Sequence, residues 1–209
     1  MTIPFRSMLF AALQLAAIGS TTAQELAAAP QLVVGESWTY QVHDGPFADG
    51  SFSFEVASRT SDGYTIAPKE QTSTMAKAPD ALNAQLDWVV NVGNDAIPMC
   101  RVSFPLAVGR TWSCKTTTPN QRGGLVENTF DYKVVGTEKI TIKAGTFDTF
   151  KIVGEGRWKN LSSGHSDAST TTVWFAPEAR GVARYSRENW PKSPGNPQVR
   201  MELVSHTVP

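Results

Sequence analysis

Apolar and polar residues alternate along most of the chain, and turn-forming residues interrupt this alternation roughly every eight to fifteen positions. A repeat of two sends successive side chains to opposite faces of a strand, whereas an amphipathic helix needs a repeat of about 3.6. The pattern therefore predicts an all-β protein with an antiparallel, strongly curved sheet, arranged as a partial barrel or a sandwich. The strands that we expect are Ser37–Val42, Ser51–Ser58, Tyr64–Pro68, Leu86–Val92, Pro98–Ser103, Thr111–Thr117, Leu125–Val135, Glu138–Ile142, Thr149–Arg157, Ser169–Phe175, Val182–Asn189 and Val199–His206.

Helical signals are weak in this sequence. The segment "APDALNAQL" is the clearest candidate, because Pro79 can occupy the first helical position and Ala, Leu and Gln favour helix. We expect at most one or two short helices in the fold. This one could cover part of the concave face of the sheet.

The stretch "ITIKAGTFDTFKIV", residues 140–153, predicts a hairpin that turns through Gly-Thr-Phe-Asp. If Ile142 pairs with Phe150, then Ile140 pairs with Ile152, and all four apolar side chains lie on one face of the sheet. The stretch contains no thiol and no general base beyond one Asp, so we interpret the turn as structural.

The first 23 residues predict a secretory signal peptide, with Arg6 before an apolar run from Met8 to Ile18 and small residues up to Ala23. This run is too short to anchor the chain across about 30 Å of hydrocarbon. No Cys lies near Ala23 to carry a lipid anchor. We therefore expect residues 24–209 to form a single β-rich domain without a membrane span, located in the periplasm or secreted.

The two cysteines, Cys100 and Cys114, predict a disulfide, because an even pair in an exported protein is normally oxidised. A hairpin centred on Ala107 would place them opposite each other, with Val102 opposite Trp112 on the same face. In that register the residues between these positions, Arg101 among them, point outward.

Four stretches of the chain, "TIKAGTFDTFKI", "VWFAPEARGVARY", "VGESWTY" and "FPLAVGRTW", resemble a poorly characterised group of exported bacterial β-proteins, the TapB-like proteins. All four are turns with hydrophobic flanks. In the second stretch the chain turns between Pro177 and Gly181. The resemblance implies an antiparallel domain of the cell envelope and supplies no catalytic residues. The architecture is also analogous, more loosely, to the curved-sheet lipoprotein carriers of the periplasm.

Sites for chemistry are scarce. The chain has 19 Lys and Arg against 19 Asp and Glu, so it lacks the basic excess that nucleic acid requires. The string "SSGHSDA", which contains His165 and Ser166, differs from a nucleophile elbow because it lacks the second Gly and the following helix. The three histidines lack metal-ligand spacing, and no phosphate-binding loop appears, so we expect no metal and no cofactor. Several strand carboxylates could form a glycosidase pair, although the sequence does not say which: Glu127, Asp131, Glu155, Glu188 and Glu202.

Aromatic residues carry the leading functional hypothesis. A strongly curved sheet can leave an apolar groove edged by Tyr or Trp on its concave face. We therefore expect an exported, non-catalytic protein that binds an apolar or amphipathic small molecule, or a lipid-modified segment, there. One alternative is an envelope module that binds a partner protein without a small-molecule pocket, and a second is a secreted hydrolase. The predicted ligand-binding residues are Trp38, Tyr40, Trp88, Phe130, Tyr132 and Trp174.

Overall fold

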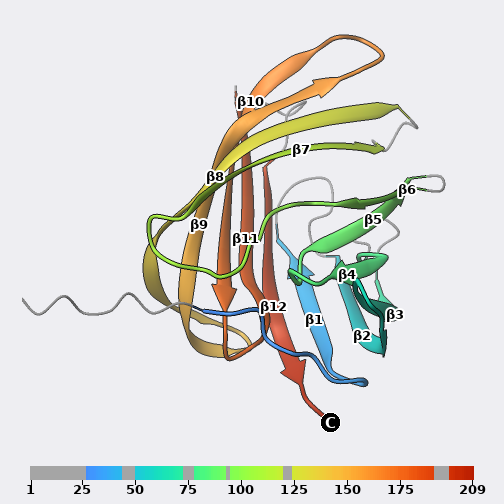
Figure 1. The fold of residues 1–209 in the computed structure, drawn as a ribbon, viewed down its shortest axis with the longest axis vertical. Helices are drawn as coiled ribbons and strands as arrows, with labels where there is room; N and C mark the ends of the chain where they lie inside the picture. Colours follow the sequence, from blue (N-terminus) through green and yellow to red (C-terminus); the bar gives the residue numbers. More distant parts are fainter. Residues whose placement is uncertain (1–26, 44–49, 73–77, 93–94, 120–123, 191–197) are drawn as a thin grey trace, which may run out of the picture.

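The chain forms one antiparallel β-sheet that curls until its two edges lie close together, which gives a nearly closed barrel (Figure 1). The structure is a computed structural model and describes residues 27–43, 50–72, 78–92, 95–119, 124–190 and 198–209. The all-β prediction is confirmed, whereas the predicted signal peptide, residues 1–23, lies outside the described residues. Within these residues the strands are β1 (Ser37–Val42), β2 (Ser51–Arg59), β3 (Gly63–Gln71), β4 (Ala81–Asn83), β5 (Trp88–Val92), β6 (Asp95–Pro98), β7 (Thr111–Pro119), β8 (Leu125–Ile142), β9 (Gly145–Asn160), β10 (Ser166–Ala176), β11 (Gly181–Trp190) and β12 (Val199–Thr207).

The order of strands across the sheet is β6-β5-β4-β3-β2-β1-β12-β11-β10-β9-β8-β7. Neighbouring strands are consecutive in sequence, except at the centre, where β1 pairs with β12. Consequently β6 and β7, which are consecutive in sequence, form the two free edges. The connection between them has to travel from one edge of the sheet to the other.

This connection, residues 99–110, is called the crossing segment, and it passes across the concave face between β6 and β7 (Figure 1). Its residues Val102, Phe104 and Leu106 are 4%, 8% and 0% exposed. The Phe104 ring meets Phe175 of β10 edge-on, with centroids 5.1 Å apart. Leu106 exchanges two backbone hydrogen bonds with Ala27, at 2.8 and 3.0 Å. Part of the concave face is therefore filled by chain that belongs to no named strand.

The predicted helix is wrong, because Ala81–Asn83 forms strand β4. Leu82 is buried and lies opposite Tyr64 on one side and Trp88 on the other. The Asn83 carboxamide oxygen accepts hydrogen bonds from the backbone N–H groups of two residues that follow, at 2.9 and 3.0 Å. This turn takes the place of a continuing helix. Pairing with neighbouring strands therefore overrides the local helix propensity.

The predicted β8–β9 hairpin exists, but its register is wrong. The turn uses residues 143 and 144 alone, so Ile142 lies opposite Gly145 rather than Phe150. Phe150 still faces the core, because it lies two positions from the buried Ile152 on β9. A β-bulge after Val134 shifts the register of β8 against this strand. The strand pair continues past this bulge, so two predicted strands are united as β8.

The predicted disulfide between Cys100 and Cys114 is confirmed, with Cα atoms 5.9 Å apart. The hairpin centred on Ala107 and the strand Pro98–Ser103 are wrong, since Cys100 has a φ of 51° and lies in the crossing segment. The indole Nε1 of Trp112 donates a hydrogen bond to the Cys100 carbonyl at 2.9 Å. We call the line between the β6 and β7 edges the seam. In the described residues no strand ladder crosses it.

A buried carboxylate supports the pairing of β1 with β12. Glu36, immediately before β1, is 0% exposed. Its oxygens lie 2.8 Å from His206 Nε2 on β12 and 3.3 Å from Arg180 Nη1 in the β10–β11 turn. The Val33 backbone N–H donates a third hydrogen bond at 3.1 Å. A buried charge with several partners is costly to disturb, so these contacts fix three segments relative to one another.

Replacing Cys100 and Cys114 together by Ala should lower the free energy of unfolding by about 3 kcal/mol, because the bridge closes a short loop that the unfolded chain would otherwise open. Equilibrium denaturation of the oxidised protein and the double variant measures this difference. Thiol titration of the denatured, unreduced protein should detect no free sulfhydryl. Two free thiols in protein isolated from an oxidising compartment would contradict the assignment.

Candidate functional site

The six aromatic residues predicted to bind a ligand lie in three different environments. Trp38 and Tyr40 on β1 are sealed in the core, at 2% and 1% exposure. The Trp38 indole donates to the Ala179 carbonyl and the Tyr40 hydroxyl donates to the Val182 carbonyl, both at 2.9 Å. Because their polar atoms are also satisfied, these two side chains are not accessible to a ligand in this conformation.

Trp174 lies on the outer face of the sheet, since its neighbours on β10, Val173 and Phe175, are the ones that point inward. Its indole Nε1 donates to Glu138 Oε2 at 3.1 Å. Lys151 also contacts this carboxylate, at 2.9 Å. Together the hydrogen bonds from Lys151 and Trp174 lower the pKa of Glu138. Trp174 is therefore part of an outer-face network and is separate from the concave face.

The remaining three, Trp88, Phe130 and Tyr132, point into the barrel. Trp88 on β5 meets the Tyr40 ring edge-on, with centroids 5.7 Å apart, whereas Phe130 and Tyr132 lie on β8 next to the edge strand β7. The Phe130 and Tyr132 rings stack with centroids 5.7 Å apart. Each ring packs on a glycine of β9: a Cβ atom at Gly154 would collide with Tyr132, and one at Gly156 would collide with Phe130. These glycines therefore provide the space that the two rings need beside the sheet.

A small cavity of about 20 Å³ lies between these rings and the seam. Its volume suits a single water molecule. Two arginines, Arg101 and Arg187, contribute to its wall. The complete set of lining residues is Met99, Arg101, Cys114, Thr116, Asn128, Phe130, Tyr132, Thr171, Tyr185 and Arg187. We call this site the seam cavity.

Arg101 belongs to the crossing segment and points into the barrel, contrary to the outward orientation predicted for it. Its guanidinium carbon lies 4.9 Å from the Trp88 ring centroid and 4.8 Å from that of Tyr185. The cation therefore lies between aromatic rings of β5 and β11, two strands that are far apart in the sheet order. The alternation of apolar and polar residues does not predict this orientation, because residues 99–110 do not form a strand.

Arg187 reaches the seam cavity from β11. Its Nε donates to Ser169 Oγ at 2.9 Å and to Asn189 Oδ1 at 3.1 Å, and its Nη2 donates to Asn128 Oδ1 at 3.2 Å. Its guanidinium also lies 5.7 Å from the Phe130 ring centroid. The sequence does carry a signal for this residue, since the alternation in β11 puts it on the same face as other inward residues.

Asp87 lies next to Arg101 and is 3% exposed. Burial raises the pKa of this carboxyl to about 6, although the positive charge of Arg101 and hydrogen bonds from backbone N–H groups act in the opposite direction. One of those N–H groups is that of Arg101, 3.1 Å from Oδ1. The other oxygen, Oδ2, has no hydrogen-bond partner. Burial also raises the pKa of the nearby Tyr132 hydroxyl, which stays protonated at neutral pH.

The residues considered for hydrolytic chemistry do not assemble into a triad. His165 Nε2 lies 3.0 Å from Asp167 Oδ2, at a turn that leads into a strand rather than a helix. Ser166 faces a groove on the outer surface. Of the strand carboxylates, Asp131 and Glu155 are direct cross-strand partners. Within the described residues, no three His, Cys, Asp or Glu side chains gather in a way that could hold a metal.

Comparison with solved structures supports the coarser part of the expected resemblance. The fold is similar to that of a predicted lipoprotein from Parabacteroides distasonis, with a TM-score of 0.55, 13% identity, and coverage of 88% of this chain and 100% of the other. It is also similar to a predicted exported protein with a YmcC-like fold from Bacteroides fragilis, with a TM-score of 0.52, 15% identity, and coverage of 87% and 100%. At these identities the likeness concerns the fold alone.

No protein-family model and no curated protein matches the sequence. The TapB-like resemblance therefore stays a prediction. The disulfide is consistent with a location outside the cytoplasm. In the part of the chain that the structure describes, no helix has the length and apolar character to cross a membrane.

The buried Asp87 predicts a pH dependence of stability. Because its pKa is raised on folding, the folded state holds a proton between about pH 4 and pH 6 that the unfolded state has lost. Stability therefore falls as the pH rises through this window and stays lower above it, by at most about 3 kcal/mol. The Asp87→Asn variant, whose amide oxygen can still accept the Arg101 N–H, should lack this contribution.

Denaturation of the wild type and of Asp87→Asn at pH 4 and pH 7.5 measures the effect. The wild-type stability minus the variant stability should decrease between these pH values. An unchanged difference would contradict the assignment, whatever the absolute stability of the variant.

Proposed function

We propose that the protein is an exported, non-catalytic binding protein that takes an amphipathic ligand with an anionic head at the seam cavity. The single observation that carries this proposal is the pair Arg101 and Arg187, two cations on the concave face that pack against aromatic rings beside one cavity. This retains the expected ligand class but changes the expected site, since the side chains of Trp38 and Tyr40 are sealed.

The chemistry of the two arginines favours an anionic head. A guanidinium stays charged at all relevant pH values and presents its N–H groups in a planar fork that matches carboxylate and phosphate oxygens. Arg187 is already oriented by Ser169, Asn189 and Asn128, so little side-chain freedom remains to be lost when an anion binds.

The apolar part of the ligand would lie along the seam. Phe130, Tyr132 and Trp88 supply aromatic surface next to the arginines, as is typical of sites for apolar chains. A cavity of about 20 Å³ is far too small for an alkyl chain. Binding therefore requires the edges β6 and β7 to part. No strand ladder within the described residues opposes that movement, whereas the disulfide limits it at one point.

A second candidate is a module that binds an envelope protein or a lipid-modified segment through a sheet edge. The observation that favours it is β7, whose nine residues have no further strand beside them in the described chain. Such an edge offers unpaired backbone groups to an added strand. The filled core is compatible with this function, because a partner at an edge needs no cavity.

The decisive experiment titrates the protein with decanoate and decyltrimethylammonium below their critical micelle concentrations, and with decanol below its solubility limit, while tryptophan emission is followed. We expect saturable binding of decanoate, with the neutral and cationic amphiphiles at least tenfold weaker. Arg187→Lys keeps the charge but loses the planar fork, so it should weaken decanoate binding about tenfold, or about 1.4 kcal/mol.

Trp174→Phe is the matched control, because it changes an aromatic residue on the outer face and should leave the decanoate affinity unchanged. Chemical denaturation establishes that each variant is folded at the assay temperature. Equal affinity for all three head groups would refute the role of the arginines. No saturable signal from any amphiphile would leave the edge-binding module as the better explanation.

A further inference from the structure

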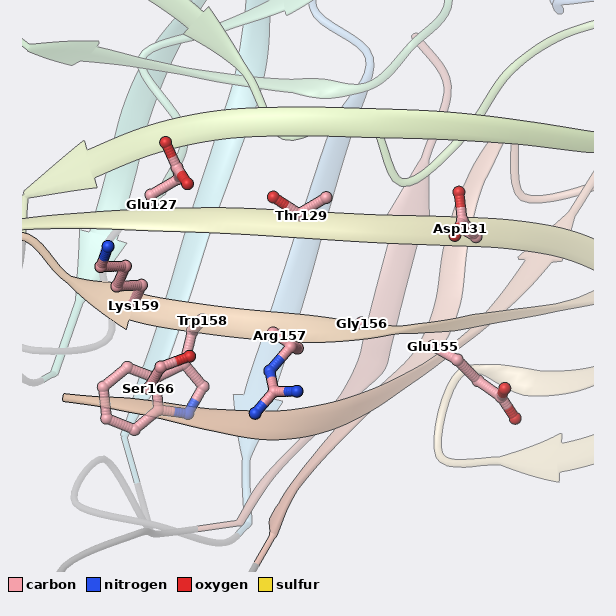
Figure 2. Close-up of a pocket in the computed structure, with 9 residues that line it drawn as sticks. All are labelled: Glu127, Thr129, Asp131, Glu155, Gly156, Arg157, Trp158, Lys159 and Ser166. Atoms are coloured by element: carbon pink, nitrogen blue, oxygen red, sulfur yellow. The ribbon is translucent and has the colours of Figure 1, made fainter. Parts of the chain in front are cut away.

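A groove of about 450 Å³ lies on the outer face of the sheet, over β8, β9 and the start of β10, away from the seam cavity (Figure 2). Three of its side chains, Glu127, Thr129 and Asp131, follow one another along β8. The facing strand β9 contributes Glu155, Arg157 and Lys159, and β10 contributes Ser166. Gly156 and Trp158 of β9 complete the lining. Most of the side chains that line the groove are thus charged or carry a hydroxyl, which distinguishes it from the seam cavity.

The strand register separates the charges of this groove along its length. Asp131 lies opposite Glu155 at one end, and Thr129 lies opposite Arg157 near the middle. At the other end Lys159 lies opposite a glutamate that already forms an ion pair with Lys115 at 2.8 Å. The uncompensated charges are thus two carboxylates at one end and two cations towards the other.

The carboxylate end carries two negative charges from residues that are partners in the strand register, although their side chains point away from each other (Figure 2). The Ser113 hydroxyl donates to Asp131 Oδ1 at 2.6 Å and so fixes that carboxylate. No ion pair within the described part of the chain involves Glu155, Arg157 or Lys159. A cation at one end and an anion at the other would compensate the charges that the sheet leaves unpaired.

The distance between the charged residues indicates the length of the ligand. Residues advance by about 3.3 Å along a strand, so the backbone position of Glu155 is about 7 Å from that of Arg157 and about 13 Å from that of Lys159. An extended peptide spans about 3.3 to 3.6 Å per residue, so a peptide of two to four residues separates its termini by a similar distance. The hydroxyls of Thr129 and Ser166 could contact the peptide bonds between these termini.

We infer that this groove binds a short peptide with free termini, its ammonium group over Asp131 and Glu155 and its carboxylate near Arg157 and Lys159. This site is independent of the seam cavity, because it uses the opposite face of the same strands. Exposed ion pairs contribute little each, so the expected dissociation constant is in the millimolar range.

The experiment uses glycine oligomers from two to six residues as probes and follows backbone amide signals of the whole protein by NMR. We expect saturable shifts at Thr129, Glu155 and Arg157, with the highest affinity for triglycine or tetraglycine. Acetylating the amino terminus or amidating the carboxyl terminus should each weaken binding at least fivefold. Raising the salt concentration from about 20 to about 500 mM should weaken it further, because the contacts are exposed.

Two variants locate the ends of the peptide. In Glu155→Gln, acetylating the peptide should cost less binding affinity than in the wild type, because the substitution removes part of the site for the ammonium group. In Arg157→Gln, amidating the peptide should likewise cost less affinity, because the substitution removes part of the site for the carboxylate. Lys143→Gln, at the distant β8–β9 turn, is the control and should change nothing. The proposal is overturned if affinity does not depend on length, if blocking the termini has no effect, or if the shifts map to other residues. Failure of decanoate to bind would not affect this result, since the two ligands use different faces.

Discussion

The width of the barrel is the constraint on which the rest of this structure depends. A barrel of about eight strands has an interior that side chains alone can fill, whereas more strands enclose a wider space. Twelve strands of the described chain curl around the interior, and the aromatic residues of β1 and β2 fill only part of it. The crossing segment fills the remaining space, because β6 and β7 form opposite edges of the sheet and their connection must cross between them. Val102, Phe104 and Leu106 thus complete a core that the strands leave open.

The crossing segment also brings polar groups into the barrel, and these groups form part of the candidate site. A segment outside the ladder has backbone groups that need partners, and Gln85 and Asp87 accept hydrogen bonds from the N–H groups of Phe104 and Arg101. Arg101 enters the interior with the same segment and rests between two aromatic rings. The raised pKa of Asp87 and the inward position of Arg101 beside the seam cavity therefore share one structural cause, whereas Arg187 reaches the same cavity from β11.

The sequence predicts the parts of this fold that depend on local pattern. Alternation identifies most strands, and the Cys100–Cys114 pair is predicted correctly although its hairpin is not, because a disulfide needs only proximity. The predicted register of the β8–β9 hairpin is wrong because the turn uses residues 143 and 144 instead of Gly-Thr-Phe-Asp. The helix prediction fails since strand pairing around Leu82 is a tertiary effect. For the site, Phe130 and Tyr132 stack beside the seam cavity, whereas Trp88 packs edge-on against Tyr40. The inward turn of Arg101 follows from strand order, which no local pattern contains.

The pairing of β1 with β12 has a consequence for the order in which the chain can fold. On either side of this pair the sheet consists of neighbours in sequence, whose contacts close short loops and form early. The central pair, with Ser37 opposite Thr207, closes the longest loop in the described chain. A chain that emerges from a membrane pore amino terminus first can thus assemble two half-sheets, but it cannot join them until β12 has emerged. Until then both half-sheets expose an unpaired edge and an apolar face, which makes this interval the one in which the chain most needs protection from aggregation.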